Sequence, residues 1–192
     1  MTADKAASAH KGQSGESVRQ HNLSTVLRLV HLQGTILRSK ITATTGLNRS
    51  TVSDLVSELS ELGLVVEKET EAPTGVGRPS MVVTATDNII AFSVNPEIDA
   101  TTVSAVALSG RVVSKERRLM RYHPTAENAI AVAAEMISKM RKQLDPGIRI
   151  VGVGVSAPGQ VRSSDGVIRF APQLGWVESA FAAALSLSLI HI

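Results

Sequence analysis

Residues 46–52 have the sequence Gly46-Leu47-Asn48-Arg49-Ser50-Thr51-Val52. The glycine permits a turn with positive φ, and asparagine is a favoured residue for capping the start of a helix. After this cap, apolar residues recur at spacings of three and four, the period of an α-helix, at Val52, Leu55, Val56, Leu59 and Leu62. The stretch therefore predicts a tight turn followed by a helix that stops at Gly63.

Two more helices are predicted before this turn. Helical spacing over Leu23, Val26, Leu27 and Val30 indicates a first helix that Gly34 closes. A short second helix is predicted over residues 39–45, with Ile41 and Thr44 facing inward and Gly46 at its end. The two helices and the capped helix that follows form a compact set of three.

Two runs rich in β-forming residues follow, over 64–68 and 80–85. A segment rich in proline and glycine, residues 72–79, joins them and carries Arg78. The order helix, short helix, turn, capped helix and hairpin predicts an α+β winged helix-turn-helix domain over residues 18–86. The simpler alternative is a plain three-helix bundle with a hairpin, whose polar helix face is merely solvated.

In a helix-turn-helix, the second helix brings its N-terminal end to the major groove of DNA. Arg49 is the expected base contact, Lys40 is placed for backbone phosphate, and Arg78 for the minor groove. The formal net charge of +3 agrees with an anionic partner without identifying one. The full set of expected DNA-binding residues is Lys40, Asn48, Arg49, Ser50, Thr51, Ser53 and Arg78.

A second domain is predicted over residues 87–192. Strand patterns occupy 89–94, 101–108 and 111–115, a helical pattern spans 126–144, and a further strand covers 148–156. Three strands, a helix and another strand indicate an α/β domain. Gly152 and Gly154 fall inside the last strand, where close packing between strand and helix is the expected reason for them.

Composition and residue spacing limit the cellular location and the kinds of chemistry expected of the chain. Residues 1–17 have no apolar period and are predicted to be a disordered tail. The chain has no cysteine, no run long enough to span a bilayer and no signal-peptide pattern, so a cytoplasmic protein without a membrane role is expected. The five histidines are scattered, and Ser156 lacks the Gly-x-Ser-x-Gly elbow. Neither a metal site, a cofactor nor an enzymatic centre is expected.

Several motifs resemble the ROK (repressor, open reading frame, kinase) family, specifically its regulators of the xylose and N-acetylglucosamine repressor type. The first is Thr45-Gly46-Leu47-Asn48-Arg49-Ser50-Thr51-Val52-Ser53, followed by Glu61-Leu62-Gly63-Leu64-Val65 and Gly75-Val76-Gly77-Arg78-Pro79. Later stretches also match, namely Gly152-Val153-Gly154-Val155-Ser156-Ala157-Pro158-Gly159, Ala171-Pro172 and Gly175-Trp176. The likeness extends from Asn22 to about Trp176.

The resemblance implies a DNA reader fused to an actin-like, ribonuclease H-like sugar domain, of which residues 87–192 would be part of the first lobe. It implies a regulator of carbohydrate metabolism that acts on a double-stranded operator, responds to a sugar or sugar phosphate and forms a homo-oligomer. Pro158, Gly159 and Trp176 are the residues expected to border the ligand pocket.

Two alternatives remain open. One is a ROK sugar kinase with an appended DNA-binding module, although Asn95-Pro96-Glu97 stands where the kinases carry a phosphate loop. Pro96 lacks an amide donor and Glu97 adds a negative charge, so ATP binding is not expected, and Asn95-Pro96 is interpreted as a strand-ending turn. The other alternative is a sugar-independent fragment for DNA binding or dimerisation. The apolar, alternating end over 185–192 suggests a truncated chain with a non-native C-terminus.

Overall fold

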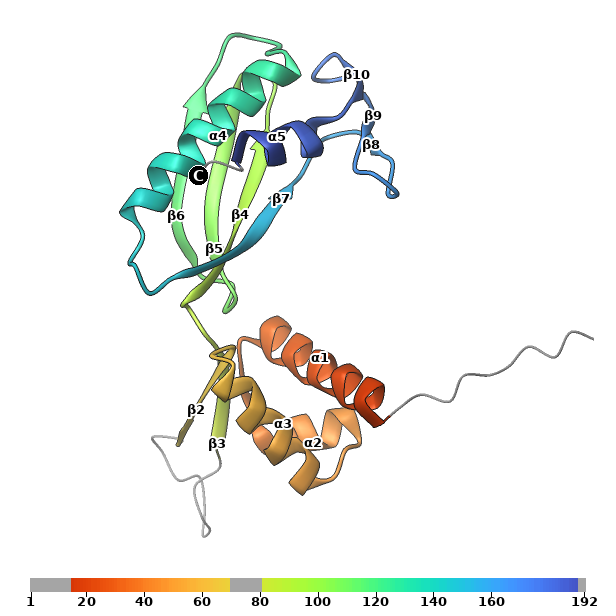
Figure 1. Ribbon diagram of the computed structural model, residues 1–192, viewed down its shortest axis with the longest axis vertical. Coiled ribbons are helices and arrows are strands. Elements are labelled where there is room, and N and C mark those ends of the chain that lie inside the picture. Colours follow the sequence, from red (N-terminus) through yellow and green to blue (C-terminus); the bar gives the residue numbers. More distant parts are fainter. Residues whose placement is uncertain (1–14, 70–80, 190–192) are drawn as a thin grey trace, which may run out of the picture. The chain divides into compact units, whose positions relative to one another are not determined.

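The computed structural model describes residues 15–69 and 81–189 (Figure 1). The chain divides into two compact units between Ala85 and Thr86. The first unit contains three helices and a small sheet, and the second contains a larger sheet, two helices and a second small sheet.

The helices of the first unit are α1 (Gly15–Gln33), α2 (Arg38–Thr45) and α3 (Arg49–Glu61). Gly34 and Gly46, which follow α1 and α2, both have positive φ, a conformation that glycine adopts without strain. The three helices bury one common set of apolar residues. That set is Leu23, Val26, Val30, Ile41, Val52, Leu55, Val56 and Leu59.

Three sequence predictions for these helices were wrong in detail. Residues 15–17 belong to α1 rather than to a tail, while residues 1–14 lie outside the described part of the chain. Thr44 is exposed, so Ile41 alone anchors α2 in the core. Leu62 follows the last residue of α3 and is 52% exposed, because the chain leaves the helix before another turn can bury it.

The sheet of the first unit has the strand order β1-β3-β2, with β1 (Thr35–Leu37), β2 (Val65–Glu69) and β3 (Met81–Ala85) all antiparallel to their neighbours. The hairpin strands β2 and β3 confirm two of the predicted runs. Strand β1 was not predicted. Ile36 and Glu67 both pair with Val83, so these three residues form one row across the sheet.

The second unit is built on a sheet with the order β6-β5-β4-β7. Its strands are β4 (Ile89–Pro96), β5 (Ala100–Ala107), β6 (Val112–Leu119) and β7 (Arg149–Val155), and α4 (Ala126–Gln143) joins β6 to β7. β4 is antiparallel to β5 and parallel to β7, which forms one edge of the sheet. The predicted succession of three strands, a helix and a strand is confirmed, with β6 reaching four residues further than expected.

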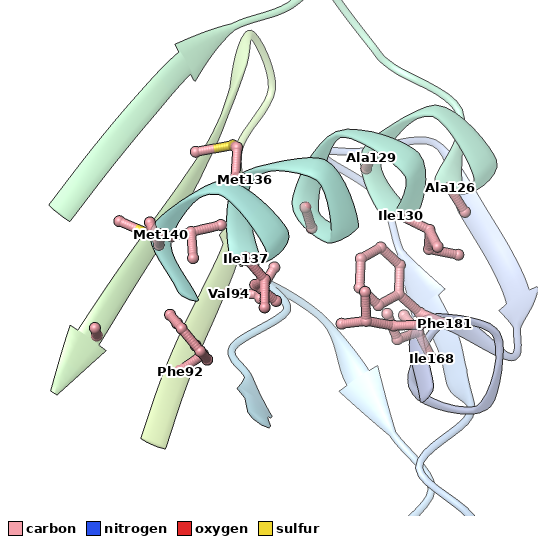
Figure 2. Packing of buried hydrophobic residues seen from close by; sticks show 14 of the residues in the cluster. Phe92, Val94, Ala126, Ala129, Ile130, Met136, Ile137, Met140, Ile168 and Phe181 are labelled. Carbon is pink, nitrogen blue, oxygen red and sulfur yellow. The ribbon is translucent and has the colours of Figure 1, made fainter. Parts of the chain in front are cut away.

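A small antiparallel sheet follows, in the order β10-β9-β8. It consists of β8 (Gln160–Val161), β9 (Ile168–Ala171) and β10 (Trp176–Ser179), and α5 (Phe181–Leu189) comes after it. Figure 2 shows residues of α4, the large sheet and α5 meeting in one core, where Phe92, Met136 and Phe181 are fully buried. Residues 185–189, in which leucine and serine alternate, belong to helix α5.

The reason expected for Gly152 and Gly154 was wrong. Both lie in β7 as predicted, but a Cβ atom added at either position would meet no other atom within 4 Å. Close packing against a helix therefore does not explain these glycines. Within the described residues, no helix is both long enough and apolar enough to cross a membrane.

Candidate functional site

The turn between α2 and α3 presents a capped helix start. The side-chain Oδ1 of Asn48 accepts a hydrogen bond from the backbone amide of Thr51 at 2.8 Å and another from the Ser50 hydroxyl at 2.8 Å. The predicted N-cap is thus confirmed. Asn48 remains exposed, but its Oδ1 already serves the helix, so its contribution is to order the first turn.

Exposure differs among the residues predicted to face DNA. Arg49 and Ser50 are exposed, whereas Thr51 and Ser53 are half-buried on the flanks of α3. The amides of Arg49 and Ser50 have no partner inside the helix, because the first turn lacks preceding carbonyl groups. A cationic side chain and free amide donors therefore meet at one helix end, an arrangement that favours a phosphate or an acceptor group of a base.

Charge along α3 changes sign after this first turn. Asp54 and Glu61 are exposed further along the helix, and Glu58 forms an ion pair with Arg19 of α1. Since carboxylates are repelled by a phosphate backbone, the N-terminal end is the part of α3 suited to approach DNA. Lys40 of α2 is also exposed. Arg78 lies outside the described residues.

Trp176, expected near a ligand, is part of the core of the second unit. Its indole Nε1 donates a hydrogen bond to the Pro124 carbonyl at 2.9 Å, and its ring stacks on Phe181 with centroids 5.3 Å apart. It lines a cavity of about 600 Å³ together with His123, Glu127 and other residues, but Pro158 and Gly159 are not part of that lining. The structure thus does not gather the three predicted ligand residues into this cavity.

Pro158 and Gly159 are exposed in the segment between β7 and β8. A Cβ atom on Gly159 would lie 2.4 Å from the Phe170 carbonyl oxygen and 2.9 Å from the Ala171 Cα. No side chain fits there without moving the backbone of β9. Gly159 is therefore required for the close approach of β8 to β9.

We expect Gly159→Ala to destabilise the second unit by about 1 to 3 kcal/mol, because its methyl group overlaps backbone atoms. Urea denaturation followed by the fluorescence of Trp176, the one tryptophan of the chain, measures this change. Gly154→Ala is the matched control, since its methyl group enters open space. Equal midpoints for the two variants would contradict the steric role of Gly159.

The β4–β5 turn carries a carboxylate rather than a phosphate-binding loop. Asn95 and Pro96 were predicted to form a strand-ending turn, but both are paired within β4, and the turn begins at Glu97, whose amide donates to the Ala100 carbonyl at 2.7 Å. A hydrogen bond from the Thr102 hydroxyl and then one from the Arg117 guanidinium lower the pKa of the Glu97 carboxyl. Glu97 is therefore ionised at neutral pH.

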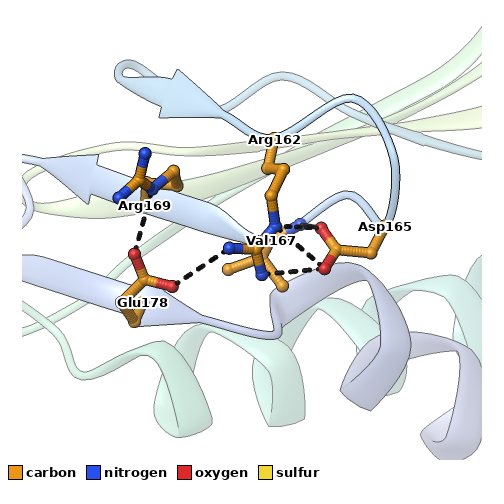
Figure 3. Close-up of polar contacts among 5 residues, drawn as sticks. All are labelled: Arg162, Asp165, Val167, Arg169 and Glu178. Atoms are coloured by element: carbon orange, nitrogen blue, oxygen red, sulfur yellow. Dashed lines mark hydrogen bonds and ion pairs between the residues drawn. The ribbon is translucent and has the colours of Figure 1, made fainter.

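An ion-pair network, not anticipated from the sequence, fixes the small sheet of the second unit (Figure 3). Arg162 donates to both carboxylate oxygens of Asp165, from Nε to Oδ1 at 3.0 Å and from Nη2 to Oδ2 at 2.8 Å. Glu178 pairs with Arg162 and Arg169. The hydrogen bond from Arg162, then that from the Val167 amide, lowers the pKa of Asp165. Because these groups are exposed, the network orients the turn more than it stabilises the unit.

Two comparisons with curated proteins bear on this arrangement. The chain is 28% identical over 160 residues to the xylose repressor of Caldicellulosiruptor bescii, covering 83% of this chain and 40% of that protein. It is 29% identical over 160 residues to the DNA-binding transcriptional dual regulator NagC of Escherichia coli strain K12, covering 82% and 39% respectively. The predicted resemblance to the ROK repressors is confirmed. No protein-family model matches the chain.

A solved structure titled as a ROK family transcriptional regulator, a homologue of the Escherichia coli MLC protein, has a similar fold. It superposes with a TM-score of 0.63 at 19% identity, covering 89% of this chain and 43% of that one. This likeness to a ROK regulator includes the partial α/β unit. The chain spans about 40% of the length of the curated ROK repressors it matches.

Proposed function

We propose that residues 18–86 form a winged helix-turn-helix domain that binds duplex DNA, within a transcriptional regulator of carbohydrate metabolism. The observation that carries this proposal is the exposed start of α3, which Asn48 caps. There the side chain of Arg49 and backbone amides without a partner inside the helix face outward. The similarity to a xylose repressor and to the transcriptional regulator NagC supports the same function.

The experiment is a selection of duplexes from a random library with the purified 192-residue chain. An enriched duplex is then titrated against a scrambled duplex of equal length at several salt concentrations. We expect tighter binding to the enriched duplex and a log–log salt dependence with negative slope, because bound cations release counterions from DNA. No enrichment and no binding at low salt would refute the proposal.

Arg49→Ala should lower the affinity for the enriched duplex by about 1 to 3 kcal/mol, because it removes the expected base contact. Binding to the scrambled duplex should fall less, since that affinity depends on phosphate contacts. Arg121→Ala, an exposed arginine of the second unit, is a control of equal charge change. If both variants weaken binding equally, Arg49 contributes charge and does not read bases.

We further propose that residues 87–192 belong to an actin-like, ribonuclease H-like lobe through which a sugar or sugar phosphate changes operator affinity. The similarity to the xylose repressor supports this. A homo-oligomer is expected, because two recognition helices must meet two half-sites about one helical turn apart. A thermal-shift and DNA-titration series with xylose, N-acetylglucosamine and their phosphates tests the response, and the absence of any effect would favour sugar-independent binding.

A sugar-kinase function is disfavoured by the β4–β5 turn. By the resemblance to the ROK kinases, Asn95-Pro96-Glu97 takes the place of their phosphate loop, where the ionised Glu97 carboxylate would repel phosphate oxygens and Pro96 lacks an amide donor. Transfer of phosphate from ATP to a hexose, measured with the complete protein, would instead support the kinase alternative.

A further inference from the structure

Arg38 connects three elements of the first unit. It is the first residue of α2, and its Nη1 lies 3.1 Å from the Glu67 Oε1 of β2 and 3.5 Å from the Ser53 hydroxyl of α3. Its side chain is 36% exposed and that of Glu67 is 20% exposed. One guanidinium therefore contacts the bracing helix, the proposed recognition helix and the sheet at the same place.

The position of Glu67 follows from the register of the sheet. Glu67 pairs with Val83, which is fully buried, and lies two residues after the buried Val65 on the same face of β2. Side chains alternate along a strand, so the carboxylate points to the side of the sheet that carries the core. A carboxylate there is costly without a partner, and Arg38 supplies one.

Ser53 lies one helical turn after Arg49 on α3. Its contact with Arg38 is thus the polar attachment closest to the exposed helix start. A second arginine, Arg19 of α1, forms an ion pair with Glu58, five residues after Ser53 on α3. The two arginines attach α3 to different neighbours, and Arg38 is the one that links it to the sheet.

We propose that Arg38 is a positioning residue for DNA recognition: by joining Glu67 and Ser53, it sets the orientation of the N-terminal end of α3 relative to β2. This inference rests on the proposed function. Arg38 acts through the geometry of α3 and not as a phosphate contact. Removing either member of the ion pair therefore has the same consequence for recognition.

The sign of the effect of Glu67→Gln separates positioning from simple charge. This substitution removes a negative charge, so electrostatics alone would tighten binding to any duplex. Positioning predicts that Glu67→Gln and Arg38→Gln both weaken binding to the enriched duplex, by about threefold or more, and lower its preference over the scrambled duplex. The double variant should be no weaker than the weaker single variant, because both remove one shared interaction.

The control for charge is Glu61→Gln, at the exposed end of α3, which should leave the preference between duplexes unchanged. Arg19→Gln controls for the loss of an ion pair on α3 that does not involve the sheet. Circular dichroism melting establishes that each variant is folded at the titration temperature. A smaller folded fraction lowers both affinities equally and leaves their ratio intact, whereas altered positioning changes the ratio.

Tighter or unchanged binding by Glu67→Gln, with an unchanged ratio, would overturn the positioning role. If Arg38→Gln does not fold, Arg38→Lys provides the same comparison, since lysine keeps the charge but its terminal nitrogen lies one bond nearer the backbone than the Nη1 that contacts both Glu67 and Ser53. A reduced ratio for Arg38→Lys supports the inference, and an unchanged one contradicts it. If the unaltered chain enriches no duplex, the proposed function itself fails, and that result does not depend on Arg38.

Discussion

Replacing Leu55 by alanine should destabilise the first unit by about 2 to 5 kcal/mol and weaken sequence-specific DNA binding with it. Leu55 is 1% exposed, and it lies between the buried Val52 and Leu59 on the inward face of α3. Its truncation leaves a cavity between α3 and the elements packed on it. Because small domains have only about 5 to 15 kcal/mol of stability, a loss at the upper end of this range removes most of the stability of a marginal unit and populates its unfolded state.

Circular dichroism during urea titration measures this loss, and binding of the enriched duplex is followed in parallel. Leu62→Ala is the matched control, since Leu62 is 52% exposed just after the same helix. We expect Leu62→Ala to have nearly the same urea midpoint and the same DNA affinity as the unaltered chain. An unchanged midpoint for Leu55→Ala would show that α3 is not held by its inward face.

Phe181→Ala should destabilise the second unit by about 3 to 5 kcal/mol. The phenyl ring is fully buried at the start of α5 (Figure 2). It stacks on Trp176, whose indole N–H donates a hydrogen bond to the Pro124 carbonyl. Its removal takes away apolar burial and a ring contact together. The small sheet and α5 should consequently loosen from α4.

The fluorescence of Trp176 during urea denaturation reports this transition. The folded variant needs its own fluorescence baseline, because removing the ring that stacks on Trp176 changes the signal of the folded state. Phe170→Ala provides the comparison, as Phe170 is 49% exposed on β9. The urea midpoint of Phe170→Ala should shift much less than that of Phe181→Ala. Similar losses for the two variants would contradict the assignment of Phe181 to the core.

The helices of both units could be predicted because their apolar period is local to each segment. Strand β1 could not, since three residues carry no period of their own. Thr35–Leu37 is a strand through its pairing with β3, which begins more than forty residues later in the chain. The prediction that Thr44 faces inward was wrong for a similar reason. Which residues of α2 are buried depends on the packing of the other elements, and they bury Ile41 alone.

The candidate site was predictable to the extent that it depends on the cap and first turn of α3. The role of Arg38 was not, because its partners Ser53 and Glu67 become neighbours through the fold. Gly159 illustrates the opposite difficulty. The sequence placed it beside a ligand pocket, and the structure shows a contact with the backbone of β9 that would require glycine in any case.

The position of β7 at the edge of its sheet also affects how this polypeptide behaves in concentrated solution. Ile150–Val155 contains no charged residue, Val151 is 63% exposed, and one side of the strand has no paired neighbour among the described residues. Natural sheets protect such rims with lysine, proline or a bulge facing outward. The register of β7 against β4 shifts at Val151, a bulge that bends this rim, and the unpaired stretch that remains is where strands of separate molecules can pair in concentrated samples.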